Sequence, residues 1–390
     1  MRFITAGESH GPALTAIVEG VPAGVSVSER HINADLRRRQ MGYGRGARQC
    51  IESDEVSITS GVRFGVTLGS PVTLVVRNRD AQNWADRMAP FGKPPASLKR
   101  ETRPRPGHAD LVGVLKVGGE DCRDVIERAS ARSTAALVAA AGIAREFLAA
   151  VGVNVFSYVT SIGSVSLDED EPLLSAPDYK PLDIEVSDLR CPSLETTEAM
   201  KARIDEARAA GESLGGAFRV VATGLLPGLG GYATPSDRLS ARIGGALFGI
   251  PSVKGVEFGL GFAAAGLPGS QVHDAITLER GRGFGRATNR AGGLEGGMTT
   301  GLPLVVTCAV KPIPTLMSPL DTIDLDTLES VEASCERSDV CAVPSAAVVA
   351  EAQMAFCLAE AYLSKFGRDD MASIRGAIAA YRRRLGTMSK

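Results

Sequence analysis

The chain has 390 residues, of which 44% are hydrophobic and 23% charged, so it is long and apolar enough to bury a sizeable core. Its net charge is −2 and only 5% of its residues are aromatic, which argues against nucleic-acid binding through overall charge or base stacking. Seven dispersed cysteines without a Cys-x-x-Cys pair favour free thiols in a reducing compartment over disulfides or a zinc site. The start has no apolar leader and no apolar run approaches membrane length, so we expect a soluble, cytoplasmic protein.

The first twenty residues are predicted to form two strands, over 1–5 and 13–19, joined by a tight glycine-flanked loop. This loop carries His10. A histidine on such a loop can move a proton near neutral pH, although loop histidines are more often structural or simply exposed.

Residues 28–39 predict a helix that ends in three arginines, with Ser28 as its N-cap. Cations are favourable at any helix C-terminus, so this run has an ordinary structural explanation. The glycine-rich loop 40–48 that follows carries Arg45 and Arg48, and its backbone can approach an anionic ligand closely. The loop lacks the Gly-Lys-Ser/Thr of a Walker A motif.

Residues 51–77 alternate apolar and polar side chains, which predicts two or three antiparallel strands. The proline-containing segment 78–99 is predicted to be a long irregular loop, a type that often forms lids or binding loops. In the stretch 103–110, prolines and a glycine favour an extended backbone and a turn that presents His108. Two arginines and a histidine there suit an anionic ligand, and a solvated basic loop is the alternative.

The clearest predicted helix spans 121–151, and its second half is apolar almost all round, as in a buried helix. Arg128, Ser130 and Arg132 lie near its first turns, where backbone N–H groups and the helix dipole favour an anion. A second long apolar helix is predicted over 346–365 and is expected to pack beside the first.

Helices and strands alternate in the rest of the second half. Helices are predicted over 192–211 and 236–249, and strands over 215–223, 253–258 and 302–310. The order of strand, loop and basic helix in residues 13–39 recurs weakly in residues 217–247. Such a repeat would fit two related halves about a pseudo-twofold axis. The basic stretch 381–384 is predicted to be a frayed, solvated tail.

Gly-Gly pairs within 281–301 let backbone N–H groups approach a flat or anionic ligand, and a long flexible hairpin is the alternative interpretation. No Gly-x-Gly-x-x-Gly motif follows an early strand, so a Rossmann domain is not expected. These elements alone predict a generic α+β domain.

Several segments together resemble the chorismate synthase family. Each segment is modest alone, but seven in the family's order, spread over nearly the whole chain, are highly specific. They are Gly7-Glu8-Ser9-His10-Gly11, Arg103-Pro104-x-Pro106-Gly107-His108-Ala109-Asp110, Arg128-Ala129-Ser130-Ala131-Arg132, Val253-Lys254-Gly255-Val256-Glu257, Thr288-Asn289-x-Ala291-Gly292-Gly293-x-Glu295-Gly296-Gly297, Lys311-Pro312-Ile313-Pro314-Thr315 and Arg337-Ser338-Asp339.

The resemblance implies a lyase that converts 5-enolpyruvylshikimate 3-phosphate to chorismate and phosphate by anti-1,4-elimination, in the shikimate pathway of aromatic amino-acid biosynthesis. It implies reduced FMN as an obligatory cofactor without net redox change, and leaves NADPH open as an external reductant. It also implies a β-α-β sandwich with long helices between two antiparallel sheets, a single domain over 1–390 and a homotetramer.

By the same resemblance, His10 protonates the departing phosphate, His108 protonates the reduced flavin and Asp339 assists proton transfer around flavin N5. The arginines Arg39 and Arg45 match positions associated with the substrate phosphate or the pyridine nucleotide, and Arg48 matches a substrate cation. The family's flavin contacts carry over to Arg128, Ala129, Ser130, Pro251, Ser252, Gly296, Lys311, Pro312, Ile313, Pro314, Thr315 and Arg337.

Two other classes of function stay open at this point. A non-catalytic protein that binds anions or nucleotides in a basic cleft would explain the arginines. This interpretation assigns no role to the two loop histidines and Asp339. An ordinary flavin or NADPH oxidoreductase would transfer a hydride to a second substrate, which a lyase does not do. Arg337 and Asp339 also fit a simple surface ion pair.

Overall fold

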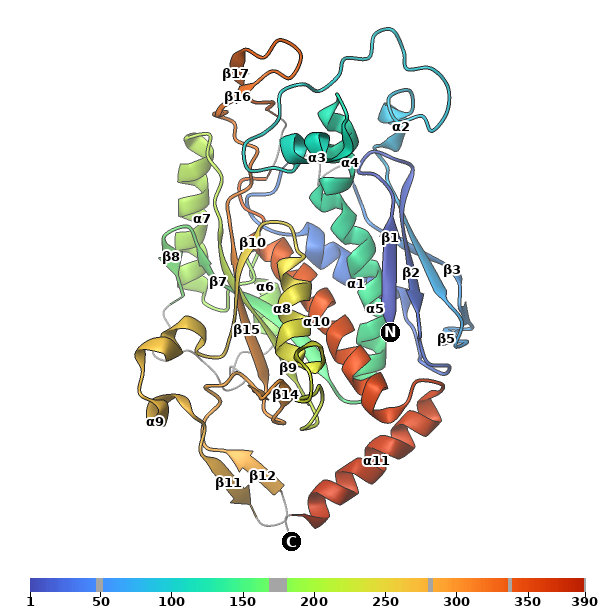
Figure 1. Ribbon diagram of the computed structural model, residues 1–390, viewed down its shortest axis with the longest axis vertical. Helices are drawn as coiled ribbons and strands as arrows, with labels where there is room; N and C mark the ends of the chain where they lie inside the picture. The colour runs from blue at the N-terminus through green and yellow to red at the C-terminus, as the bar shows by residue number, and fades with distance from the viewer. Residues whose placement is uncertain (47–51, 168–180, 280–282, 336–338, 389–390) are drawn as a thin grey trace.

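The computed structural model describes residues 1–46, 52–167, 181–279, 283–335 and 339–388. In this part of the chain, two antiparallel sheets face each other across a layer of helices (Figure 1). The prediction of a mixed α+β fold, with antiparallel sheets and long packed helices, is confirmed.

The first sheet has the strand order β1-β2-β6-β3. Its strands are β1 (Arg2–Ala6), β2 (Ala13–Glu19), β3 (Val56–Ser60) and β6 (Val72–Arg77), and the small hairpin of β4 (Val62–Arg63) and β5 (Val66–Thr67) lies between β3 and β6 in sequence. Alternate side chains of β2, namely Leu14, Ala16 and Val18, are buried, as expected for a strand with one face on the core. The antiparallel strands predicted over 51–77 are confirmed by the pairing of β3 with β6.

The second sheet has the order β10-β15-β9-β7-β8, again antiparallel throughout. Its strands are β7 (Asn154–Ile162), β8 (Val165–Ser166), β9 (Gly216–Thr223), β10 (Val253–Phe258) and β15 (Leu304–Val310). The strands predicted over 215–223, 253–258 and 302–310 correspond to β9, β10 and β15. This sheet matters for function because the ends of β10 and β15 carry residues of the cavity described below.

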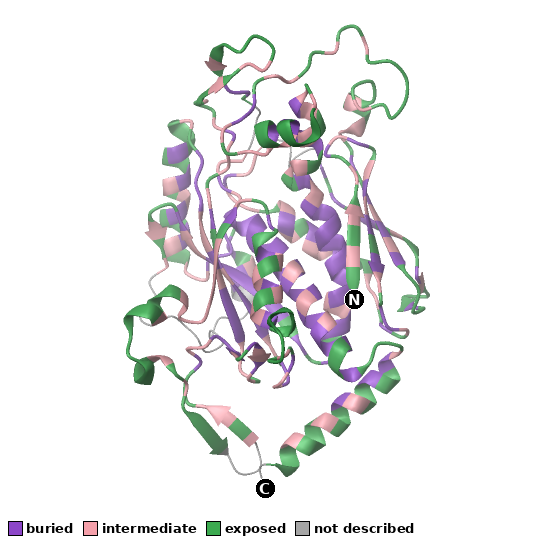
Figure 2. Ribbon diagram, in the orientation of Figure 1, coloured by how far each residue is buried: buried purple, intermediate pink, exposed green. Residues whose placement is uncertain are grey.

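The middle layer contains α1 (Glu29–Gln40), α5 (Thr134–Ala150), α8 (Leu239–Phe248) and α10 (Val343–Phe366). As predicted, the two long apolar helices α5 and α10 pack against each other. Helix α5 packs mainly against β2 and β6, with a smaller contact to β7, whereas α10 packs against β7 and β9, so each helix mainly covers one sheet. Figure 2 shows that buried residues concentrate in this layer.

Two helical stretches, Cys122–Ala150 and Val343–Phe366, are long and apolar enough to cross a membrane by length and composition. However, 72% and 78% of their apolar windows are buried inside the protein. Their hydrophobicity is therefore that of core helices, which must be apolar on all sides when other elements surround them.

The helix predicted over 121–151 is interrupted at Ser130, whose ψ of 140° ends α4 (Cys122–Ala129). A short 3-10 turn, η2 (Ala131–Ser133), then leads into α5. The Ser130 hydroxyl accepts a hydrogen bond from the backbone N–H of Arg132 at 3.2 Å, so the side chain caps the new turn. No proline or glycine marks this break in the sequence, and a single continuous helix was therefore the wrong prediction.

The remaining elements lie around the two sheets and the helix layer (Figure 1). The helices are α2 (Ala81–Trp84), α3 (Asp110–Val117), α6 (Pro181–Val186), α7 (Leu194–Ala209), α9 (Gly269–Val272) and α11 (Met371–Thr387), with 3-10 turns η3 (Pro235–Asp237) and η4 (Gly261–Gly266). The hairpins pair β11 (Ile276–Glu279) with β12 (Gly283–Arg286), β13 (Leu294–Glu295) with β14 (Met298–Thr299), and β16 (Asp321–Ile323) with β17 (Ser330–Glu332).

The prediction of a frayed tail over 381–384 is wrong, because these residues belong to α11, although the three arginines among them are exposed to solvent as predicted. The Tyr381 hydroxyl donates a hydrogen bond to the carbonyl of Pro227 at 2.9 Å, and its ring packs edge-on against Phe366. The Tyr381 ring thus anchors α11 to the rest of the protein. The arginines that follow it in the sequence indicate only a solvent-exposed end.

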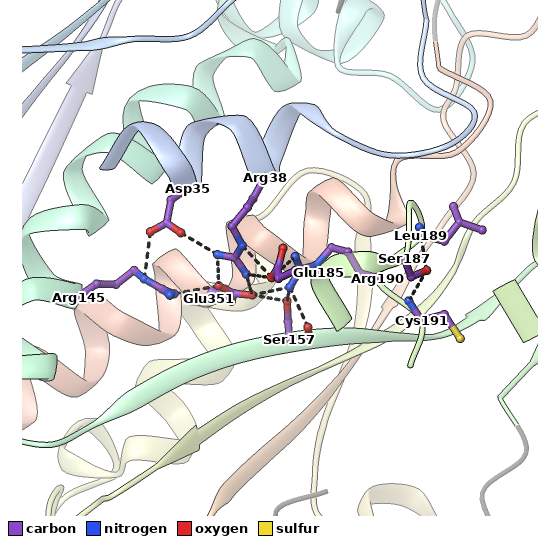
Figure 3. A network of polar contacts seen from close by, with 10 residues as sticks. All are labelled: Asp35, Arg38, Arg145, Ser157, Glu185, Ser187, Leu189, Arg190, Cys191 and Glu351. Carbon is purple, nitrogen blue, oxygen red and sulfur yellow. Dashed lines mark hydrogen bonds and ion pairs between the residues drawn. The ribbon is translucent and has the colours of Figure 1, made fainter. Parts of the chain in front are cut away.

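A buried ionic network ties the helix layer to the second sheet (Figure 3). At its centre, the carboxylate of Glu351 on α10 is 1% exposed. It accepts hydrogen bonds from Arg38 of α1 at 2.8 and 2.9 Å, from Arg145 of α5 at 2.8 Å and from Arg190 at 3.0 Å. The hydroxyl of Ser157 on β7 donates a further bond at 2.6 Å, so one carboxylate connects three helices and a strand.

The contact between α1 and α5 depends on Gly142, because a Cβ there would lie 2.5 Å from Cγ1 of Ile32. We expect Gly142→Ala to lower the free energy of unfolding by about 1–3 kcal/mol through overpacking, measured by urea denaturation. Gly376→Ala on α11 is the matched control, since its Cβ would meet nothing within 4 Å. The control should stabilise the protein by up to about 1 kcal/mol through helix propensity. Equal effects of the two substitutions would contradict this account of the packing.

Candidate active site

A cavity of about 570 Å³ brings together segments that are far apart in the sequence. The loop after β1, the turn around His108, the break between α4 and α5, the start of β10, the end of β15 and the first turns of α10 all contribute to its walls. The three residues expected to be catalytic, His10, His108 and Asp339, all line this one cavity. The sequence separates them by more than three hundred positions, so their convergence comes from the fold.

Glu127 of α4 fixes the position of His10. One carboxylate oxygen accepts the backbone N–H of His10 at 2.8 Å and the other lies 2.7 Å from Nδ1 of the ring. Burial would raise the pKa of Glu127, but the hydrogen bonds from His10 outweigh it and hold the pKa below its usual range. Because an ionised carboxylate only accepts hydrogen bonds, Nδ1 carries a proton and Nε2 is the ring nitrogen left for a ligand.

His108 has a similar arrangement. Its Nδ1 makes a short hydrogen bond to the carboxylate of Asp110, which is fully buried and also accepts hydrogen bonds from Nε and the backbone N–H of Arg105 at 2.9 and 3.0 Å. Burial would raise the pKa of Asp110, yet the hydrogen bonds from His108 and Arg105 lower it well below its usual range. The ionised Asp110 therefore holds the proton of His108 on Nδ1 and leaves Nε2 for a ligand.

The wall beside the two histidines is cationic. Arg39 and Arg132, which are 4% and 7% exposed, both pair with the carboxylate of Asp54, and Nη2 of Arg132 also lies 3.6 Å from Oε2 of Glu52. Burial, followed by the charges of Arg132 and Arg45, lowers the pKa of Arg39, although Asp54 acts in the opposite direction. The Nε atoms of Arg39 and Arg45 are buried without a hydrogen-bond partner in the described part of the chain. A phosphate or carboxylate bound here would satisfy both the charge and the donors.

Asp339 enters the cavity beside Arg45. Its carboxylate pairs with the guanidinium of Arg45 at 2.8 Å and accepts the backbone N–H of Gly46 at 2.6 Å. These contacts tie the start of α10 to the loop after α1. Arg48 and Arg337, which were also expected at the site, lie outside the described residues.

Most of the residues expected to contact a flavin line the same cavity. These are Ala129, Ser130, Pro251, Ser252, Lys311, Ile313, Pro314 and Thr315. The ammonium of Lys311 donates a hydrogen bond to the carbonyl of Gly107 at 2.6 Å, which connects the end of β15 to the His108 turn. Burial and the neighbouring Lys254 lower the pKa of Lys311, so two amines add positive charge on this side.

Three expected flavin contacts do not line the cavity. Arg128 instead donates hydrogen bonds to the carbonyls of Thr5 and Gly7 at 2.8 and 3.1 Å, which supports the loop that carries His10. Pro312 lies between cavity residues without lining the cavity itself. Gly296 is in the β13–β14 turn, which meets the N-terminal end of α8, whereas the cavity lies beyond the C-terminal end of that helix.

Sequence reasoning missed the carboxylates behind the histidines. Glu127 precedes the Arg-Ala-Ser segment by one residue on the amphipathic α4, and nothing in the sequence connects it to His10. Asp110 lies inside a recognised motif and two residues after His108, which is the signal that could have identified it.

Comparisons with known proteins agree with this geometry. The family model described as chorismate synthase matches residues 1–363. The chain is 49% identical to the chorismate synthase of Aquifex aeolicus over 390 residues, covering 98% of this chain and 97% of that protein. This chain belongs to the chorismate synthase family. The chorismate synthase of Rubrobacter xylanophilus is 53% identical over 386 residues, with 98% and 97% of the two chains covered.

A crystal structure of a chorismate synthase has the same fold, with a TM-score of 0.81 and 40% identity, and the match covers 99% of this chain and 98% of that one. The similarity therefore extends over both sheets, the helix layer and the cavity. The chorismate synthase family assignment and the convergence of the two histidines in one cationic cavity support each other, because the first rests on the sequence and the second on the fold.

Proposed function

We propose that this chain is a lyase that converts 5-enolpyruvylshikimate 3-phosphate to chorismate and phosphate, the chorismate synthase reaction of the shikimate pathway. Besides family membership, one structural observation supports the proposal. Two histidines, each with Nδ1 held by a buried carboxylate, line one cavity with a cluster of buried arginines. Proton donors beside a cationic wall suit a reaction in which phosphate leaves a substrate that also carries carboxylates.

The cationic wall is assigned to substrate binding. Arg39, Arg45 and Arg132 hold the phosphate and carboxylate groups, because all three line the cavity and each has a guanidinium nitrogen that is buried without a hydrogen-bond partner among the described residues. Their rigid ion pairs with Asp54 and Asp339 fix the guanidinium planes before the substrate arrives. Such preorganisation reduces the entropy lost when the substrate is oriented.

Proton movement is assigned to the two histidines. His10 donates a proton from Nε2 to the leaving phosphate, while Glu127 stabilises the ring orientation and its positive charge. Nε2 of His108 would give a proton to the reduced flavin, with Asp110 and Arg105 holding the ring. Asp339, which lines the same cavity, assists proton transfer.

The cofactor is assigned as reduced FMN, which supplies electron density transiently and accepts a hydrogen when it is bound. The residues present fit such a group. Lys254 and Lys311 offer two amines to its phosphate, and the lining residues Ile313, Pro314 and Ala129 are apolar, which suits a flat ring.

The finer features of the family are proposed for this chain as well. We assign the layered arrangement to a β-α-β sandwich in a single domain over 1–390, with the two sheets as pseudo-twofold halves. Exposed apolar side chains on β1 and on the β11–β12 hairpin, such as Ile4, Ile276 and Leu278, support assembly into a homotetramer. The buried thiols, including Cys308 and Cys341, support a cytoplasmic location.

An anaerobic assay tests the function. Protein, dithionite-reduced FMN and 5-enolpyruvylshikimate 3-phosphate are mixed, and phosphate release and chorismate absorbance are followed together. Equal appearance of both products without net oxidation of the flavin is the expected result. Net oxidation of the flavin in proportion to product would identify an oxidoreductase. If the folded protein gives no product, the lyase proposal is wrong and the chain is instead a non-catalytic protein that binds anions.

A further inference from the structure

Trp84 stacks on the ring of His10. Their ring centroids lie 3.9 Å apart with an interplanar angle of 24°. Trp84 is the last residue of α2, in the segment that follows the first sheet, and it is the only tryptophan of the chain. His10 lines the cavity whereas Trp84 does not, so the indole supports the imidazole from behind and leaves the cavity free.

The same indole also contacts Arg123, which lies beside the carboxylate that holds His10. The guanidinium of Arg123 lies 5.3 Å from the Trp84 ring centroid, and its Nη1 lies 3.7 Å from the Oε1 of Glu127. Oε1 is the oxygen that accepts from Nδ1 of His10. Trp84 therefore covers one face of the histidine ring, Glu127 holds its Nδ1 edge, and Arg123 connects Trp84 with Glu127.

We propose that Trp84 is a positioning residue for His10, acting through ring stacking rather than through contact with the substrate. A ring held only by one hydrogen bond at Nδ1 can still rotate about that bond and swing Nε2 out of line. A stacked indole removes this freedom and excludes water from one face of the imidazole. The His10 side chain is only 11% exposed, which is consistent with such a cover.

This inference rests on the proposed function, since it assumes that His10 is the proton donor. Trp84→Ala is expected to lower kcat by about tenfold or more with a smaller change in KM, because a misoriented donor slows the chemical step. Trp84→Phe keeps an aromatic face and should stay within about threefold of the wild type. Phe91→Ala is the matched control, since Phe91 is an exposed aromatic residue in the same loop and should have no effect.

A double-substitution cycle separates positioning from a general structural role. If Trp84 acts only through His10, then adding Trp84→Ala to His10→Ala should change kcat by less than about twofold. If the two losses multiply, or if Phe91→Ala is as harmful as Trp84→Ala, the proposal is wrong.

Fluorescence tests the stack without substrate or flavin. Because Trp84 is the sole tryptophan, the tryptophan emission of the protein reports this site alone. His10→Ala should raise the emission intensity, since an imidazole in van der Waals contact quenches an indole, and His31→Ala should not. Unchanged emission in His10→Ala would overturn the stack even if the enzyme is active. A clear change in emission with no chorismate formed by the wild type would instead refute the proposed function alone.

Discussion

Replacing His10 with alanine is expected to lower kcat by about 10²–10⁴-fold, the range that a positioned general acid contributes. The phosphate would then leave without a proton from Nε2, and Glu127 would remain buried without the ring that it now accepts from. Substrate affinity should change little, because the arginine wall stays intact. The measurement is kcat and KM for chorismate formation with reduced FMN under anaerobic conditions.

His31 provides the matched control for this substitution. It too has Nδ1 on a carboxylate, at 2.9 Å from Oε1 of Glu146, but its side chain is 71% exposed and does not line the cavity. His31→Ala should retain activity within about twofold, as expected for a surface change. Equal losses in the two variants would show that the His10 effect is not catalytic.

Glu351→Gln is expected to lower the free energy of unfolding by about 3–5 kcal/mol, the cost of breaking a buried ion pair by removing one partner. The glutamine keeps the shape of the side chain but leaves the Arg38, Arg145 and Arg190 guanidiniums without their shared charge (Figure 3). Urea denaturation at pH 7 gives the value. Glu198→Gln is the control, because its ion pair with Lys201 is exposed and should contribute less than about 1 kcal/mol.

The same network predicts how acid affects stability. Burial would raise the pKa of Glu351, but the charges of Arg38, Arg145 and Arg190 lower it from 4.5 to about 2. A depressed pKa means that this stabilisation is full above pH 4.5 and is lost as the pH falls toward 2. The difference in unfolding free energy between wild type and Glu351→Gln should therefore shrink over this window. A difference independent of pH would contradict the ionised state of Glu351.

Sequence patterns predicted the elements better than their junctions. Apolar runs identified α5 and α10 as buried helices, and alternation identified β3 and β6, because burial imposes its period on the sequence. The break at Ser130 was missed since it depends on a hydroxyl cap and on neighbouring segments, with no local breaker residue. The C-terminal helix was missed because Tyr381, which anchors it, finds its partners in distant segments.

The candidate site also combines residues that sequence motifs predicted with residues that only the fold brings together. Motifs identified His10, His108 and Asp339, and the fold places all three in one cavity. The partners that fix His10, namely Glu127 and Trp84, come from elsewhere in the chain, whereas Asp110 lies in the same motif as His108, which it holds. Gly296 was expected from a motif but lies at the other end of α8 from the cavity, so a matching motif did not guarantee proximity within this chain.

A crystal structure with 5-enolpyruvylshikimate 3-phosphate and FMN would test the central claim most directly. We expect both molecules in the cavity between His10 and His108, with the substrate phosphate within hydrogen-bond distance of Nε2 of His10 and its carboxylates on the arginine wall. The flavin should lie against Ile313 and Pro314, near His108. Substrate bound outside this cavity, or with its phosphate away from His10 and the arginines, would contradict the account.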